Sequence, residues 1–248
     1  MDVENLDLIV EKLKAANGSQ KVVDQMLHDH GAPVVLGWLE FLGFPRNDVY
    51  AVTDAPNDCP WQHENDEPTV VVEETFHSLA EQLPDMVAFI GRHCVAVAVV
   101  RFHWAWLKVY LIKRESKLSL LVGGPANGEL SLEGELSSWG APPSLASFYG
   151  VHDGFGPLAS SNSFWSENSI LPSQGLIPLA RMVHESEELP YNPDDLLMFS
   201  PNGYGDGRCF QRQTIQQVNP PTVMWLNKDR SLIEEWGFYE YVDALFSQ

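Results

Sequence analysis

The residues best placed to do chemistry lie in the segment PPSLASFYGVHDGFG, residues 142–156, where His152 and Asp153 adjoin in a turn closed by glycines. A histidine oriented by a carboxylate can act as a base, but it needs a nucleophile held against it. No G-x-S-x-G nucleophile motif lies nearby, and adjacent side chains tend to point apart. We therefore interpret Asp153-Gly154 as a turn that ends a helix, and we predict that the chain is not an enzyme.

A second glycine-rich segment, NGYGDG at residues 202–207, has the composition of a phosphate-binding loop. Such a loop must open a helix, because the helix N-terminal amides bind the phosphate. The residues that follow, RCFQRQT, are typical of a strand. The sequence thus predicts a hairpin turn that contains Asp206.

Three further pairs have the residue types of metal ligands or catalytic acids: His28 with His30, His93 with Cys94, and Glu234 with Glu235. The two histidine-containing pairs lack the companions and spacing of a metal site. The two glutamates would lie about 100° apart on a helix, so they cannot face each other across a glycosidic bond. We expect no metal and no cofactor.

Aromatic side chains are better candidates for function. Phe164 and Trp165 stand in a loop rich in serine and asparagine, and Tyr204 stands in the glycine turn. Large aromatic residues often dominate the energy of protein interfaces. These side chains either form an exposed binding centre or fold back onto the sheet. In the first case, three acids form a rim around them: Asp153, Glu167 and Asp206.

The apolar pattern predicts the elements that position these residues. Helices are expected near residues 4–30 and over 75–91, and a meander of strands over 94–123. The second half begins with a helix from Pro142, continues with a hairpin over 196–211 and a strand over 222–227, and closes with a helix over 232–246. This pattern is typical of the α+β class, with one antiparallel sheet and helices packed against it.

A segment rich in glycine, serine and proline, residues 125–143, separates two periodic regions. We therefore expect an additional α+β N-terminal region over 1–134 and a second domain over 135–248. A fragment that begins near Leu136 is expected to fold alone.

Charge restricts the class of partner. The chain has 34 acids and 15 bases, a formal net charge of −19, and both halves contribute: residues 1–130 hold 19 acids and 10 bases. Such a chain repels phosphate backbones and anionic lipids, so nucleic-acid and membrane binding are not expected. The charge either serves solubility or attracts a basic protein partner. Three widely spaced cysteines, no apolar run of membrane-spanning length and an acidic N-terminus favour a cytoplasmic protein.

The order of blocks in the second half resembles the SMI1/KNR4 family, also called the SUKH superfamily. The likeness runs from PPSLASFYGVHDGFG through LLMFSPNGYGDGRCFQ and PTVMWLN to EEWGFYEYVDALF, and covers about residues 135–248. His152-Asp153-Gly154 stands where the family commonly has Asn-Gly. Residues 1–130 do not match the family pattern.

The resemblance implies a function in binding. Bacterial members act largely as immunity proteins that neutralise toxins delivered between competing cells, and fungal members serve as regulatory scaffolds. With its acidic charge, the chain is expected to bind and block a toxin that has a basic surface, such as a nuclease. The alternative is a regulatory scaffold or adaptor. The sequence leaves the oligomeric state open.

Overall fold

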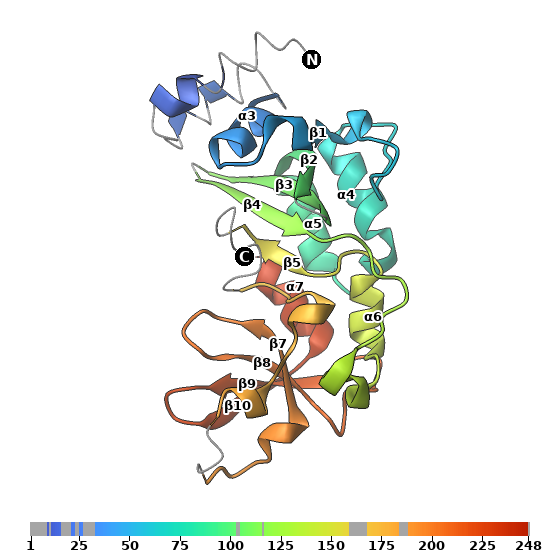
Figure 1. The fold of residues 1–248 in the computed structure, drawn as a ribbon, viewed down its shortest axis with the longest axis vertical. Helices are drawn as coiled ribbons and strands as arrows, with labels where there is room; N and C mark the ends of the chain where they lie inside the picture. Colours follow the sequence, from blue (N-terminus) through green and yellow to red (C-terminus); the bar gives the residue numbers. More distant parts are fainter. Residues whose placement is uncertain are drawn as a thin grey trace.

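The computed structural model describes residue 9 and residues 11–15, 21–22, 25–26, 33–102, 105–115, 117–158, 168–183 and 188–247. These residues form two antiparallel sheets stacked along the long axis of an elongated molecule, with helices beside and between them (Figure 1). The expected α+β class is therefore confirmed.

The first sheet has the order β1-β2-β3-β4-β5. Its strands are β1 (Val49–Ala51), β2 (Cys94–Phe102), β3 (Ala105–Arg114), β4 (Lys117–Gly123) and β5 (Phe155–Pro157). The middle strands are apolar almost throughout because both faces of the sheet are buried. One face packs on the larger core, which contains Val99 and Tyr110, and the other on a smaller core, which contains Val100 and Val109.

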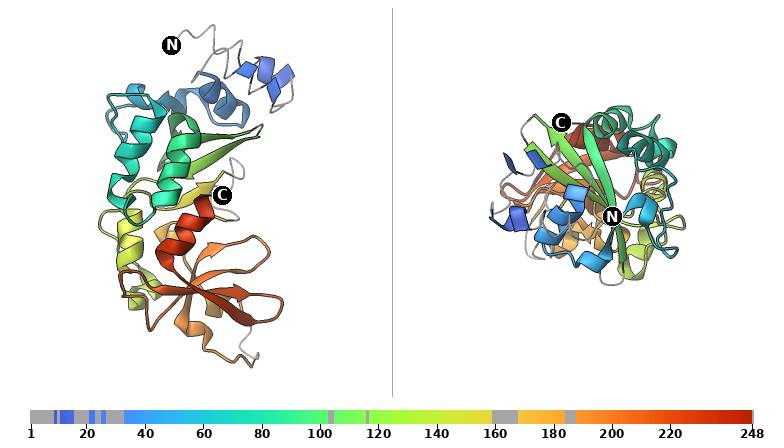
Figure 2. Two further views of the ribbon diagram at one scale, coloured as in Figure 1. Left: turned by 180° about the vertical axis from the view of Figure 1, so that it is seen from behind. Right: turned by 90° about the horizontal axis from the view of Figure 1, so that it is seen from above.

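The helices from residue 33 onward are α3 (Pro33–Phe41), α4 (Pro68–Phe76), α5 (Pro84–His93), α6 (Pro143–Tyr149) and α7 (Phe238–Phe246). Helices α4, α5, α6 and α7 place residues in the larger core, and α3 packs on the opposite face of the first sheet (Figure 2). Four of the five begin with proline, which suits the first helical turn because its missing N–H has no partner there. Of residues 4–30, the structure describes residue 9 and residues 11–15, 21–22 and 25–26, and all of these are helical, as expected.

The second sheet has the order β10-β9-β8-β7-β6. Its strands are β6 (Ile177–Pro178), β7 (Leu196–Pro201), β8 (Gly207–Gln211), β9 (Pro221–Leu226) and β10 (Ser231–Gly237). The meander over 94–123, the hairpin over 196–211 and the helix from Pro142 are confirmed.

Two helix predictions were wrong in extent. Residues 231–237 form β10 and pair with β9, so only the part from Phe238 onward is helical. The apolar residues over 231–237 have helical spacing, but the hydrogen bonds to β9 hold this segment as a strand. Trp236, which was expected in the core, is 43% exposed. The helix expected over 75–91 is divided between α4 and α5, because Pro84 cannot continue a helix and starts a new one.

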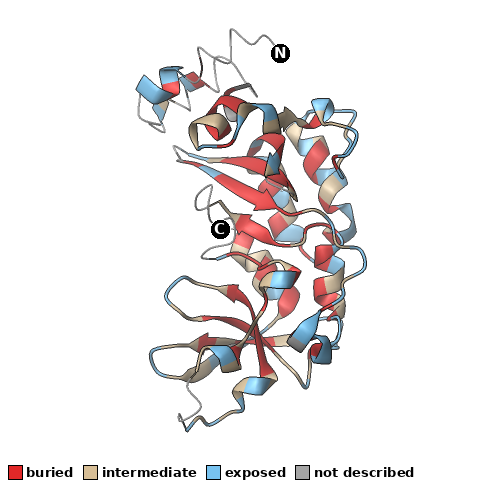
Figure 3. Ribbon diagram, viewed as in Figure 1, coloured by how far each residue is buried: buried red, intermediate tan, exposed pale blue. Residues whose placement is uncertain are grey.

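One core connects the two sheets across residue 135. Strand β5 extends the first sheet by pairing with β4, and α7 packs against α5. The larger core joins Val99 of the first sheet to Phe199 and Phe210 of the second. Buried segments lie in both sheets and in the helices beside them (Figure 3). The second half thus supplies a strand and a helix to the first half.

Candidate functional site

Asp153 holds a loop together. Its Oδ1 accepts a hydrogen bond of 2.6 Å from the backbone N–H of Ser173, and its Oδ2 accepts one of 2.7 Å from the Ser173 hydroxyl. The Asn127 side-chain amide also donates to Oδ2, at 3.4 Å. Asp153 is half-buried, and its carboxylate therefore fixes the segment after α6 against the segment before β6.

Asp206 has a similar role in the second sheet. It accepts hydrogen bonds from the backbone N–H of Asn227 at 2.7 Å and from the Asn202 amide at 3.1 Å, which joins the β7–β8 turn to the β9–β10 turn. Tyr204, in the same turn, is 83% exposed. Asp206 thus supports the turn that presents Tyr204 to solvent.

The other three predicted binding residues, Phe164, Trp165 and Glu167, lie outside the described residues. Of the three that are described, Asp153 belongs to a loop beside the first sheet, whereas Tyr204 and Asp206 belong to a turn of the second. The acidic rim around an aromatic centre stays a prediction.

His152 is fully buried and does not form a pair with Asp153. Its Nδ1 donates to the carbonyl of Gly124 at 2.8 Å, so Nε2 is the acceptor for the Tyr110 hydroxyl at 2.7 Å. The ring stacks on Phe155. Burial lowers the pKa of His152 to about 3, which keeps the imidazole neutral. These contacts give His152 a structural role at the centre of the core.

A second buried polar group, which sequence reasoning missed, is formed by Lys108, His63, Glu74 and Thr75, here called the Lys108 cluster. Lys108 is fully buried on β3. Its Nζ donates to His63 Nε2 and to Thr75 Oγ1, both at 2.9 Å, and lies 5.0 Å from the centre of the Trp61 ring. The signal in the sequence was the single lysine inside the apolar strand WAWLKVYLI.

In the Lys108 cluster, the His63 ring lies between the Lys108 ammonium and the Glu74 carboxylate and is hydrogen-bonded to both. Because Lys108 donates to His63 Nε2, the proton of the neutral ring is on Nδ1, which donates to Glu74 Oε2 at 2.8 Å. Burial lowers the pKa of Lys108 to about 7. Coulombic interactions with Cys59 and Glu74 raise this pKa, but by less than burial lowers it. Burial and the nearby ammonium also lower the pKa of His63.

An amine with a pKa near 7 is what a lysine base or nucleophile requires. However, Lys108 has no exposed surface, so a substrate cannot touch Nζ in this conformation. The Lys108 cluster is therefore a buried ionic network with an exposed carboxylate, Glu74, at its outer end.

The partners of Asp153 line a polar groove of about 450 Å³. The lining includes Asn127, Glu129, Glu133, Ser173, Gln174 and Arg181. Glu129, Glu133 and Arg181 are exposed. The groove combines two carboxylates and one guanidinium with amide and hydroxyl groups, so it suits a polar ligand or a protein surface with basic side chains.

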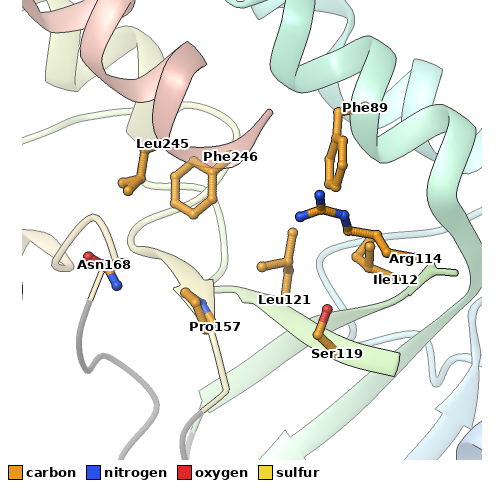
Figure 4. Close-up of a pocket in the computed structure, with 9 residues that line it drawn as sticks. All are labelled: Phe89, Ile112, Arg114, Ser119, Leu121, Pro157, Asn168, Leu245 and Phe246. Atoms are coloured by element: carbon orange, nitrogen blue, oxygen red, sulfur yellow. The ribbon is translucent and has the colours of Figure 1, made fainter. Parts of the chain in front are cut away.

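A separate cavity of about 380 Å³ lies where α5 and the end of α7 meet strands β3, β4 and β5 (Figure 4). This apolar cavity is lined mainly by Phe89, Ile112, Leu121, Leu245 and Phe246. Among the described residues that line it, Arg114 is the one with a charge. The polar groove and the apolar cavity share no lining residue.

Within the described residues, no group of three histidine, cysteine, aspartate or glutamate side chains could hold a metal ion. The same part of the chain contains no helix that is long and apolar enough to cross a membrane. Comparisons with models of protein families, with curated proteins and with solved structures give no match for this chain.

Proposed function

We propose that this protein binds and blocks a protein partner without chemistry on it, and that the partner is a toxin with a basic surface. The resemblance of residues 135–248 to SMI1/KNR4 proteins supplies the immunity role. The observation that carries the proposal is the polar groove, where Glu129 and Glu133 are exposed side by side with hydrogen-bonding groups.

The construction of the groove supports a role in recognition. Asp153 fixes Ser173 and Asn127 in place through three hydrogen bonds, so these two lining residues are held before a partner arrives. Preorganised contacts lose less entropy on binding. The net charge of −19 adds a long-range field that steers a basic partner toward the protein.

The test uses the protein encoded beside this chain in its genome as the toxin candidate. Both are purified, and binding kinetics are measured over a salt series. We expect a one-to-one complex, inhibition that needs stoichiometric amounts, and association that slows as salt rises. Inactivation of the toxin by catalytic amounts of this protein would show an immunity enzyme instead.

A charge reversal locates the contact. Glu129→Lys with Glu133→Lys is expected to slow association at least about tenfold and to flatten its salt dependence, because charge pairs at an interface mainly change the association rate. Glu73→Lys with Glu81→Lys, which reverses two exposed acids outside the groove, is the matched control. Equal effects of the two changes would mean that the charge acts only as a general field.

Trp165 tests the aromatic part of the proposal. Trp165→Ala is expected to speed dissociation and to weaken binding by about 2 kcal/mol or more, as for other interface hot spots. Its melting temperature is measured in parallel. A lower melting temperature with unchanged dissociation would place Trp165 in the core and remove it from the proposed binding residues.

A further inference from the structure

The apolar cavity differs from the rest of this acidic protein in its charge. Its apolar walls include Phe89 of α5, Leu121 of β4 and Phe246 of α7 (Figure 4). Its volume of about 380 Å³ falls within the range of small-molecule sites, about 300–1,000 Å³. Apolar walls of this kind remove a hydrocarbon group from water, which is favourable in proportion to the area buried.

Arg114 supplies the charge in the described lining of this cavity. The guanidinium carbon lies 5.4 Å from the centre of the Phe89 ring, and the group points toward the space between Leu121 and Phe246 (Figure 4). Among the described residues, no carboxylate forms an ion pair with Arg114. In a chain with more than twice as many acids as bases, this arginine is available to an external anion.

A histidine of α5 also contacts the lining of this cavity. The His93 ring contacts Phe89 at 4.7 Å between ring centres, and its Nδ1 donates to the Lys113 carbonyl at 3.2 Å. Arg92, beside His93, is exposed at the end of α5. A helix C-terminus favours cations, which explains the position of Arg92 and His93 but not that of Arg114 on β3.

We propose that this cavity binds a medium-chain carboxylate, with the carboxylate on Arg114 and the hydrocarbon chain against Leu121 and Phe246. An arginine binds a carboxylate through two parallel N–H···O bonds, which are stronger than neutral hydrogen bonds. A polyanion or nucleic acid does not suit this cavity, because its walls are apolar and its lining has a single cation. Ser119 and Asn168 complete the lining with a hydroxyl and an amide.

The site is independent of the proposed blocking function, since its lining does not overlap with the polar groove. The protein would then have two binding sites for partners of opposite charge. The partner of the groove is a basic protein, whereas the ligand of the cavity is a small anion with an apolar tail.

Calorimetric titration of the full chain with decanoate tests the proposal, and decanol provides the same hydrocarbon chain without the charge. We expect saturable one-to-one binding of decanoate, at least about tenfold tighter than that of decanol, since the carboxylate adds charge-assisted hydrogen bonds that the alcohol cannot form. Absence of saturable binding at millimolar decanoate, or equal binding of the two compounds, would overturn the proposal.

Two substitutions place the ligand. Arg114→Gln, at an exposed residue, is expected to weaken decanoate binding about tenfold or more and to leave decanol binding unchanged. Ser119→Trp, also at an exposed residue, fills the cavity and is expected to abolish binding of both compounds.

Arg101→Gln is the matched control, because Arg101 is an exposed arginine on β2 that pairs with Asp58 and does not line the cavity. Circular dichroism checks that each variant is folded. If Arg114→Gln binds decanoate as the parent does, or if Arg101→Gln weakens it equally, the carboxylate is not held at Arg114 and the proposal is wrong.

Discussion

The buried ammonium of Lys108 has a measurable effect on the pH dependence of folding. The folded protein holds the pKa of Lys108 at about 7, against 10.5 for an ordinary lysine. Between pH 7 and pH 10.5, Lys108 is protonated in the unfolded chain and largely deprotonated in the folded protein. The free energy of unfolding therefore rises with pH across this window, and the cost of burying the charge is complete below pH 7.

The size of the effect follows from the two pKa values. One pKa unit corresponds to 1.36 kcal/mol, so the whole shift represents a cost of about 5 kcal/mol at pH below 7. Between pH 7.0 and 8.5 the free energy of unfolding should rise by about 1–2 kcal/mol from this group alone. Lys108→Met, which keeps an unbranched side chain of similar length, should remove that rise.

Urea unfolding at pH 7.0, 7.5, 8.0 and 8.5 measures this slope for the parent and the variant. The criterion is the difference in slope and not stability at one pH, because the variant also loses the hydrogen bonds to His63 and Thr75. His63 has a lowered pKa and titrates below this window. Cys94 and Cys209, whose pKa values do not depend on Lys108, affect both proteins equally and cancel in the difference. Cys59 interacts with Lys108, so both proteins carry Cys59→Ser in this comparison.

Lys228→Met, at an exposed turn, serves as the matched control and should keep the parental slope. If Lys108→Met retains the full rise between pH 7.0 and 8.5, Lys108 is not the group that releases the proton. The account of the Lys108 cluster as a buried cation with a depressed pKa would then be refuted.

Three further outcomes are expected. Gly123→Ala should lower stability by about 1–3 kcal/mol in urea unfolding, because a Cβ there would lie 2.4 Å from the buried His152 ring. The pKa of His152, lowered to about 3, should make the protein lose stability as pH falls from 6.5 toward 3, and His152→Gln should reduce that loss in thermal melts. Contrary to the expectation from the glycine- and proline-rich boundary, a fragment of residues 135–248 should melt without a cooperative transition, because β5 would lack β4 and α7 would lack α5. A sharp transition of the fragment would contradict this.

The sequence alone determined the local elements. Apolar runs bounded by glycine and proline placed the meander over 94–123, the hairpin over 196–211 and the helix that begins at Pro143, because these signals depend on residues close together in the chain. It also predicted that Asp153-Gly154 would form a turn, and Gly154 has φ of +86°, a conformation that suits glycine. Over 231–246 the helical apolar spacing predicted one helix, but pairing with β9 made residues 231–237 a strand.

Only the tertiary structure decided which side chains meet. Lys108 and His63 are 45 residues apart, Tyr110 and His152 are 42 apart, and Asp153 and Ser173 are 20 apart. Their contacts depend on the packing of α4 and the loop before it over β3, and on β5 joining the first sheet. The same packing buries His152, exposes Tyr204 and creates both the polar groove and the apolar cavity. Sequence patterns report periodicity along one chain segment, whereas burial, pKa and cavities arise from surfaces that several segments form together.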